Sequence, residues 1–97
     1  MVTADENLYL GVCIDTTSGI GFCAEHSAVA AMVTSGERVI RKIVAVGEDG
    51  KPIPPCGRCR ELMSQISLKN LDAEVIIRKG HSVGLRELLP YPWDERV

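Results

Sequence analysis

The chain has 97 residues, a length that suits one small domain, and we expect residues 1–97 to fold as a single unit. Hydrophobic residues make up 45% of it and charged residues 25%, with a net charge of -2, so nothing favours binding to nucleic acid or to an anionic membrane. No apolar run approaches the ~20 residues of a membrane span and no leader opens the chain, so we expect a cytoplasmic protein with reduced thiols.

The first half of the sequence predicts a strand, a helix and a second strand. A β-rich run over residues 8–14 follows a turn at 5–7, and residues 1–3 are enough for the stub of a partner strand. A helix is expected over 23–34, with Gly36 as its stop. It is apolar nearly all round, which calls for burial on more than one face and, in so short a chain, favours a homo-oligomer.

The second half continues the alternation of strands and helices. A buried strand is expected within 38–46, followed by a proline-rich loop over 47–55 and a helix over 56–67 with one apolar stripe. Short strands over 73–78 and 80–83 then lead to a helical turn at 85–89, and the tail 91–97 is too short to add to a core. This alternation predicts an α/β fold with helices on the faces of a sheet.

Three of the four cysteines fall at the starts of the two expected helices. Cys56 and Cys59 have the C-x-x-C spacing that chelates zinc at a helix start, and Cys23 opens the preceding helix. Helix N-termini stabilise thiolates, and soft sulfur ligands select zinc over harder cations. The sequence therefore predicts a zinc site that joins the two helix starts.

Spacing alone leaves three interpretations of this cluster. In a structural site His26 supplies the fourth ligand, whereas in a redox site Cys56 and Cys59 form a thioredoxin-like dithiol and leave Cys23 without a role. In a catalytic site the three cysteines hold zinc, the fourth position stays open, and Glu25 moves protons. Glu25 also has a simple structural explanation, because acidic residues favour the first turn of a helix.

The two motifs together resemble a known family. Cys23-Ala24-Glu25, followed by Pro55-Cys56-Gly57-Arg58-Cys59, is similar to the signature of the zinc deaminases. The chain resembles the cytidine deaminase superfamily in its small homotetrameric branch with three cysteine ligands, and "PCGRCRE" and "LRELLP" look most like blasticidin-S deaminase. The resemblance implies an α/β/α fold with a mixed sheet, a Zn²⁺ cofactor and a homo-oligomer, with a tetramer favoured. It also implies conversion of a cytidine-, deoxycytidine- or blasticidin S-like aminopyrimidine to its keto form with release of ammonia.

The resemblance also implies roles for individual residues: Cys23, Cys56 and Cys59 as zinc ligands, Glu25 as the proton carrier, and Ala24 in contact with the substrate. His26 stands where close relatives carry an arginine that hydrogen-bonds the thiolates. Three thiolates outweigh the charge of Zn²⁺ and weaken its ability to acidify a bound water. Positive groups near the sulfurs should restore this ability, and the candidates are His26, Arg58 and Arg60. We expect His26 to tune the thiolates; the alternative is a non-catalytic zinc-stapled module with His26 as fourth ligand.

Two departures from the family bear on the substrate and on completeness. Cys13 and Asp15 stand where nucleoside deaminases hold the ribose with Asn and Glu, and a thiol is a poor donor while Asp is one methylene shorter. A substrate other than cytidine therefore stays open, and Cys13 suits a small buried strand residue better than it suits any catalytic role. We also expect the chain to lack the family's first helix and most of its first strand. Tyr91 and Trp93 stand where family aromatics close the site, or they pack on their own domain.

Overall fold

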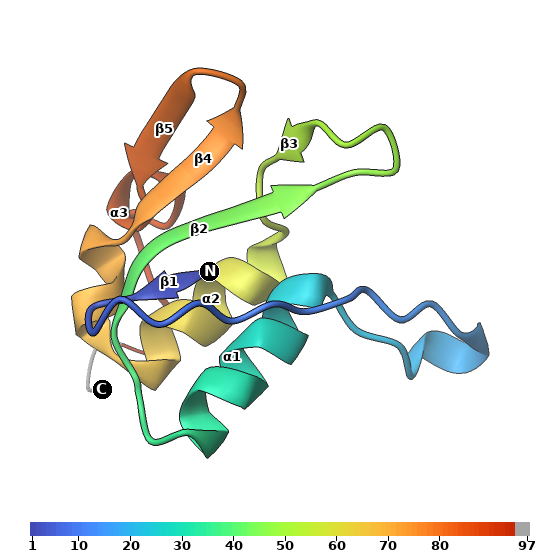
Figure 1. Ribbon diagram of the computed structural model, residues 1–97, viewed down its shortest axis with the longest axis horizontal. Coiled ribbons are helices and arrows are strands. Elements are labelled where there is room, and N and C mark those ends of the chain that lie inside the picture. Colours follow the sequence, from blue (N-terminus) through green and yellow to red (C-terminus); the bar gives the residue numbers. More distant parts are fainter. Residues whose placement is uncertain (95–97) are drawn as a thin grey trace.

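A mixed β-sheet with two helices beside it forms the body of the protein (Figure 1), which the computed structural model describes over residues 1–94. In chain order the elements are β1 (Val2–Thr3), η1 (Thr17–Gly19), α1 (Ala24–Thr34), β2 (Ile40–Val46), β3 (Pro52–Ile53), α2 (Gly57–Ile66), η2 (Leu68–Asp72), β4 (Glu74–Arg78), β5 (His81–Gly84) and α3 (Leu85–Leu88). The strand order is β1-β2-β4-β5, with β3 paired to β2. Strands β2 and β4 are parallel and the other pairs antiparallel, which confirms the predicted class.

The core lies where α1 and α2 meet the sheet. Because β2 and β4 are parallel, the chain must cross over between them, and α2 lies in this connection. Ile43 and Val75 face each other in the register of these strands and are both buried. Met32 from α1 and Met63 from α2 are fully buried in the same cluster. Apolar packing thus fixes the two helices relative to the sheet and to each other.

The two long helices form where the sequence predicts them. At the end of α1, Gly36 adopts φ 88°, and the N–H of Glu37 donates to the carbonyl of Met32 at 3.1 Å. A glycine adopts this left-handed conformation without a Cβ penalty, so it stops the helix as expected. Within this chain α1 buries one face only and leaves Ala30 exposed. Among residues 1–94, no helix is long and apolar enough to cross a membrane.

The prediction of a strand over residues 8–14 is wrong. Leu8 forms an isolated bridge with Val2, and Ile14 forms another with Phe22, but no ladder joins the residues between them. A β-rich composition favours extended backbone, yet a strand also needs a neighbouring edge to pair with. Residues 8–22, here called the arm, instead run past the start of α1 and away from the sheet (Figure 1). The sequence also did not predict β3, η1 and η2, which are very short.

Asn70 joins three elements through its fully buried side chain. Its Oδ1 accepts the N–H of Ile40 at 2.7 Å, and its Nδ2 donates to the carbonyls of Arg38 at 3.0 Å and Met63 at 2.9 Å. These three backbone groups belong to the start of β2 and to the last turn of α2. All three would lose their hydrogen-bond partner if the Asn70 amide were removed. Because an unsatisfied buried polar group costs about 1–3 kcal/mol, this amide is a major determinant of how α2 sits on the sheet.

Replacing Asn70 should therefore lower stability sharply. We expect Asn70→Ala to reduce the free energy of unfolding by about 3 kcal/mol in urea denaturation, because three backbone groups lose their buried partner. Asn7→Ala is the control, since the Asn7 amide makes an exposed hydrogen bond to Glu37. Equal losses of stability in the two variants would contradict the role given to Asn70.

Candidate functional site

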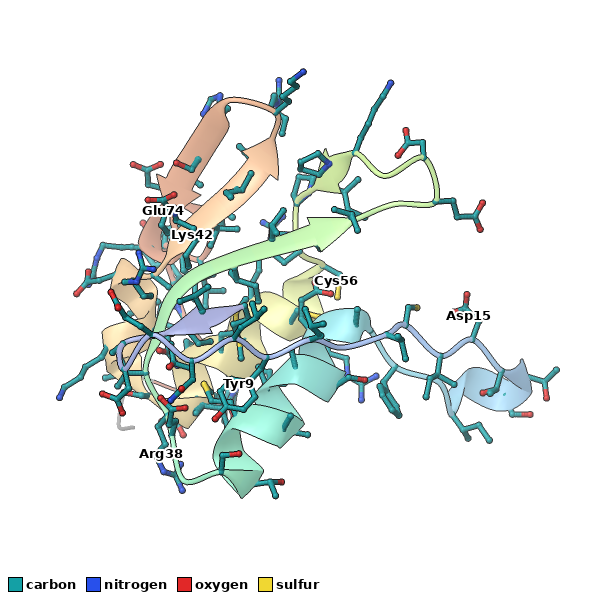
Figure 2. The ribbon with its side chains drawn as sticks, in the orientation of Figure 1. Tyr9, Asp15, Arg38, Lys42, Cys56 and Glu74 are labelled. Carbon is teal, nitrogen blue, oxygen red and sulfur yellow. The ribbon has the colours of Figure 1, made fainter. Side chains whose placement is uncertain are left out.

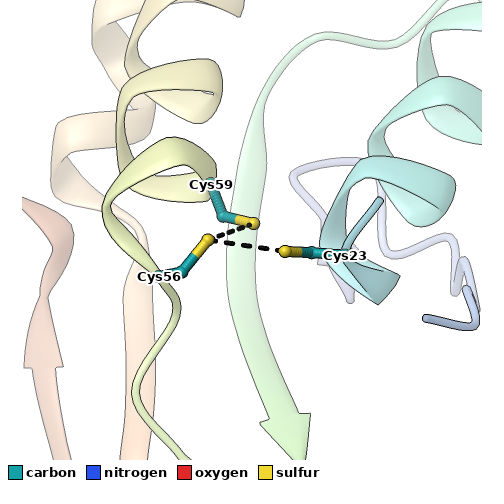
Figure 3. A group of neighbouring side chains, drawn as sticks. All are labelled: Cys23, Cys56 and Cys59. Atoms are coloured by element: carbon teal, nitrogen blue, oxygen red, sulfur yellow. Dashed lines mark hydrogen bonds between the residues drawn. The ribbon is translucent and has the colours of Figure 1, made fainter. Parts of the chain in front are cut away.

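Three cysteine sulfurs meet where α1 and α2 begin (Figure 3). The Sγ atoms of Cys23, Cys56 and Cys59 all lie within 4.8 Å of one another, with 3.4 Å from Cys56 to each of the other two. Zinc–sulfur bonds of about 2.3 Å at tetrahedral angles place ligand sulfurs about 3.8 Å apart. The cluster therefore fits a metal ion that is bound by three thiolates.

The local backbone explains this convergence. Cys23 and Cys56 are the N-cap residues of α1 and α2, with extended ψ angles of 156° and 164°, and Cys59 lies in the first turn of α2. Cys23 makes no cap hydrogen bond to α1, whereas the Cys56 sulfur receives backbone N–H groups from the first turn of α2, and the two sulfurs lie 3.4 Å apart across the gap between the helices. Both helices direct their unpaired N–H groups and partial positive charge at the cluster.

The three thiols differ in how readily they ionise. Burial opposes ionisation of Cys56, but hydrogen bonds from the backbone N–H groups of Cys59 and Arg58 and from the neighbouring thiols lower the Cys56 pKa overall. The hydrogen bond with Cys56, then burial, raises the pKa of Cys23. Burial raises the pKa of Cys59 far above its usual range. A thiolate is thus favoured first at Cys56, where the N–H groups of α2 converge.

Glu25 lies in the first turn of α1 and lines a cavity of about 500 Å³ together with Ala24 and Cys13. Its side chain is only 8% exposed, and no hydrogen bond or ion pair with residues 1–94 occupies its carboxylate. No buried side-chain oxygen in residues 1–94 lacks a hydrogen-bond partner, so the Glu25 carboxylate must be reachable from the cavity that it lines. The simple explanation of Glu25 as a first-turn acidic residue does not account for this burial.

The three predicted tuning residues lie differently around the sulfurs. The Nδ1 of His26 is 3.4 Å from the Sγ of Cys59, and burial followed by the charge of Arg58 lowers the His26 pKa. Arg58 is exposed and reaches Cys56 through its backbone N–H. The guanidinium of Arg60 donates to two backbone carbonyls, those of Pro55 and Leu88.

Of the two predicted ribose contacts, one lines the cavity. Cys13 lines it with Glu25, is exposed and lies outside any strand, and its thiol donates to Asp15 Oδ1 at 3.7 Å. Asp15 itself is not part of the lining and stands on the arm away from the body of the protein (Figure 2). The tail aromatics Tyr91 and Trp93 are 89% and 79% exposed, and residues 95–97 of the tail lie outside the described residues.

Sequence reasoning missed Gly11, whose lack of a side chain lets the arm approach the first turns of α1 closely. A Cβ at this position would lie 2.3 Å from the carbonyl oxygen of Ala24 and 2.6 Å from the backbone nitrogen of Ala28. The Ser27 hydroxyl donates to the carbonyl of Val12 at 3.0 Å and secures the same contact. The available signal was a glycine inside a β-rich run, which marks a close backbone approach.

Comparison with known proteins agrees with this geometry. No family model matches the chain. Cytidine deaminase from Halalkalibacterium halodurans is 29% identical over 98 residues, which span 93% of this chain and 70% of that protein. Cytidine deaminase from Mycoplasma genitalium is 39% identical over 69 residues, which span 69% of this chain and 53% of that protein. The crystal structure of cytidine deaminase from Burkholderia pseudomallei is 31% identical, with a TM-score of 0.80 over 95% of this chain and 76% of that chain.

The chain belongs to the cytidine deaminase family. This confirms the resemblance, and the cytidine deaminase from Mycobacterium leprae shares the fold with a TM-score of 0.80 at 29% identity. Membership supports a deaminase-type hydrolase, and the cysteine cluster fits the family's three-cysteine branch. The chain is shorter than these relatives, since it spans 70% and 76% of two of them.

The contact at Gly11 makes a test of how the arm supports the site. Gly11→Ala should force the arm off the first turn of α1, because the new methyl group would overlap backbone atoms. We expect more than 10-fold lower deaminase activity, or about 2 kcal/mol lower stability if the arm stays in place under strain. The control is Gly84→Ala, whose Cβ would meet only the carbonyl of Leu71 at 3.8 Å. If Gly11→Ala, like the control, matched wild type in both activity and stability, this role of Gly11 would be contradicted.

Proposed function

We propose that the protein is a zinc-dependent hydrolytic deaminase of an aminopyrimidine, either cytidine- or deoxycytidine-like or blasticidin S-like. The observation that carries this proposal is the meeting of three cysteine sulfurs at two helix N-termini, with the largely buried Glu25 of the same helix start lining a cavity. A cavity of about 500 Å³ lies within the usual range of small-molecule sites. Membership of the cytidine deaminase family supports the reaction class.

In this proposal Cys23, Cys56 and Cys59 bind Zn²⁺, which supplies Lewis-acid activation of water. The backbone N–H groups at the start of α2 stabilise the thiolate form of Cys56 and so prepare the ligand set. His26, in contact with Cys59, draws charge from the sulfurs through its ring nitrogen.

Glu25 is the proposed proton carrier. Its carboxylate accepts a proton from the attacking water, then delivers protons to the ring nitrogen and to the departing amine, so that water and aminopyrimidine yield the keto product and ammonia. Because Glu25 is nearly buried and makes no competing hydrogen bond within residues 1–94, its oxygens stay available for these transfers. Ala24 and Cys13 line the same cavity and are the proposed substrate contacts. Asp15 does not line the cavity, so it could contact only a part of the substrate that extends beyond it.

The proposed oligomeric state follows from the exposed apolar surface. Leu10, Val12 and Val46 are 78%, 68% and 60% exposed and all line the same cavity, so they form one exposed apolar surface. We propose a homo-oligomer, with a tetramer favoured, that covers this surface. We further propose a cytoplasmic, single-domain enzyme without nucleic-acid or membrane partners.

The central test combines metal analysis with an ultraviolet assay of cytidine, deoxycytidine, cytosine and blasticidin S. We expect about one zinc per chain and turnover of at least one compound. Glu25→Gln should lower the rate by at least ~10²-fold without loss of zinc, because positioned proton transfer contributes about 10²–10⁴-fold. Glu48→Gln is the control in an exposed loop. Zinc without turnover of any compound, or full activity of Glu25→Gln, would contradict the proposal.

The alternative of a zinc-stapled, non-catalytic module deserves one specific test, because His26 Nδ1 lies 3.4 Å from Cys59 Sγ. If His26 only contacts a ligand, His26→Gln should still bind one zinc per chain, with affinity lowered by about 10–100-fold. A chelator competition assay measures this, with the exposed His81→Gln as the control. Complete loss of zinc from His26→Gln alone would identify His26 as a ligand and favour the module.

A further inference from the structure

Arg60 connects two parts of the chain that are distant in sequence. Its Nε donates to the carbonyl of Pro55 at 2.7 Å, and its Nη1 donates to the carbonyl of Leu88 at 3.2 Å. Pro55 is buried and directly precedes Cys56, whereas Leu88 is the last residue of α3. One planar guanidinium therefore bridges the loop that carries a cysteine of the cluster and the C-terminal segment, residues 85–94.

The next residue of α2 holds the same segment at a second point. Glu61 Oε1 accepts the backbone N–H of Trp93 at 2.6 Å. Leu85 is fully buried, and its N–H donates to the carbonyl of Ala73 at 2.9 Å, so the start of the segment is anchored in the core. Between these two anchors, Arg60 is the contact that links the segment to the Pro55–Cys56 peptide.

The geometry of the link suits arginine. Two different nitrogens of the guanidinium, Nε and Nη1, bind the two carbonyls. A guanidinium presents its N–H groups in a fixed planar fork, whereas a lysine ammonium is a flexible point charge. A bond to the Pro55 carbonyl fixes the orientation of the peptide that enters Cys56, and with it the direction in which the Cys56 side chain leaves the backbone. Arg60 thus acts on the cluster through backbone position.

We propose that Arg60 is a positioning residue that couples the C-terminal segment to zinc binding at Cys56. Zinc and the docked segment then stabilise each other, because a coupling free energy between two sites acts equally in both directions. This inference rests on the proposed zinc site, and it differs from the earlier expectation that Arg60 draws charge from the sulfurs. The two ideas predict different behaviour of a lysine variant.

The experiment measures zinc affinity by competition with a chromophoric chelator in the full chain. Arg60→Gln should weaken zinc binding by about 10-fold or more, as is typical when groups that support metal ligands are removed. Arg60→Lys keeps the charge but loses the fork, so it should also bind zinc more weakly than wild type. Arg86→Gln is the matched control, because Arg86 lies on α3 and its side chain, within residues 1–94, makes an exposed ion pair with Asp72 at 3.0 Å and no other hydrogen bond.

Hydrogen exchange of residues 85–94, with and without zinc, provides the second readout. Zinc should slow exchange of this segment in wild type and in Arg86→Gln, and this zinc-dependent protection should be lost in Arg60→Gln. A merely structural role of Arg60 would destabilise zinc-free and zinc-bound protein equally and leave zinc affinity unchanged, which would overturn the inference. Wild-type affinity in Arg60→Lys would do the same, since charge alone would then suffice.

The outcomes also separate this inference from the proposed function. If wild type binds no zinc, both fail together. If wild type binds zinc and deaminates a substrate while Arg60→Gln binds zinc as tightly as Arg86→Gln, only the coupling is wrong.

Discussion

The candidate site depends on one constraint: two helices from different parts of the chain must begin at the same point. Each begins at a cysteine N-cap, and Cys59 adds a third sulfur from the first turn of α2. Burial of Met32 and Met63 against the sheet fixes the two helix axes, and the Asn70 amide ties the far end of α2 to the start of β2. Core packing therefore sets the spacing of the sulfurs, and a bound metal ion would add to an arrangement that already exists.

The same helix starts organise the electrostatics of the site. Backbone N–H groups lower the Cys56 pKa, while burial raises the Cys59 pKa, so the thiolate form is favoured at Cys56 and disfavoured at Cys59. Glu25 follows Cys23 by two residues and lies buried at the cavity that the arm encloses through Gly11. The proposed metal site, proton carrier and substrate cavity would thus share the first turn of α1, the arrangement that hydrolytic deamination requires.

Sequence reasoning found the features that depend on local pattern. The helix of α2 and its buried residues Cys59 and Met63 follow from spacing, and the family follows from the two cysteine motifs. It failed at the arm, because whether an extended segment becomes a strand depends on an edge supplied elsewhere in the fold. The reach of Arg60 to Leu88 was equally hidden, since contacts between distant segments leave no local pattern. His26 keeps both of its interpretations, because a ring nitrogen 3.4 Å from the Cys59 sulfur is compatible with a residue that tunes the thiolate and with a fourth ligand.

The most direct test of the account is zinc K-edge X-ray absorption on the zinc-loaded protein. We expect three sulfur scatterers at about 2.3 Å and one oxygen or nitrogen scatterer, without the outer-shell pattern of an imidazole ring. That result would leave one zinc position open for chemistry, with His26 in contact with Cys59 and Glu25 beside it. An imidazole pattern, or fewer than three sulfurs, would contradict the proposed catalytic site.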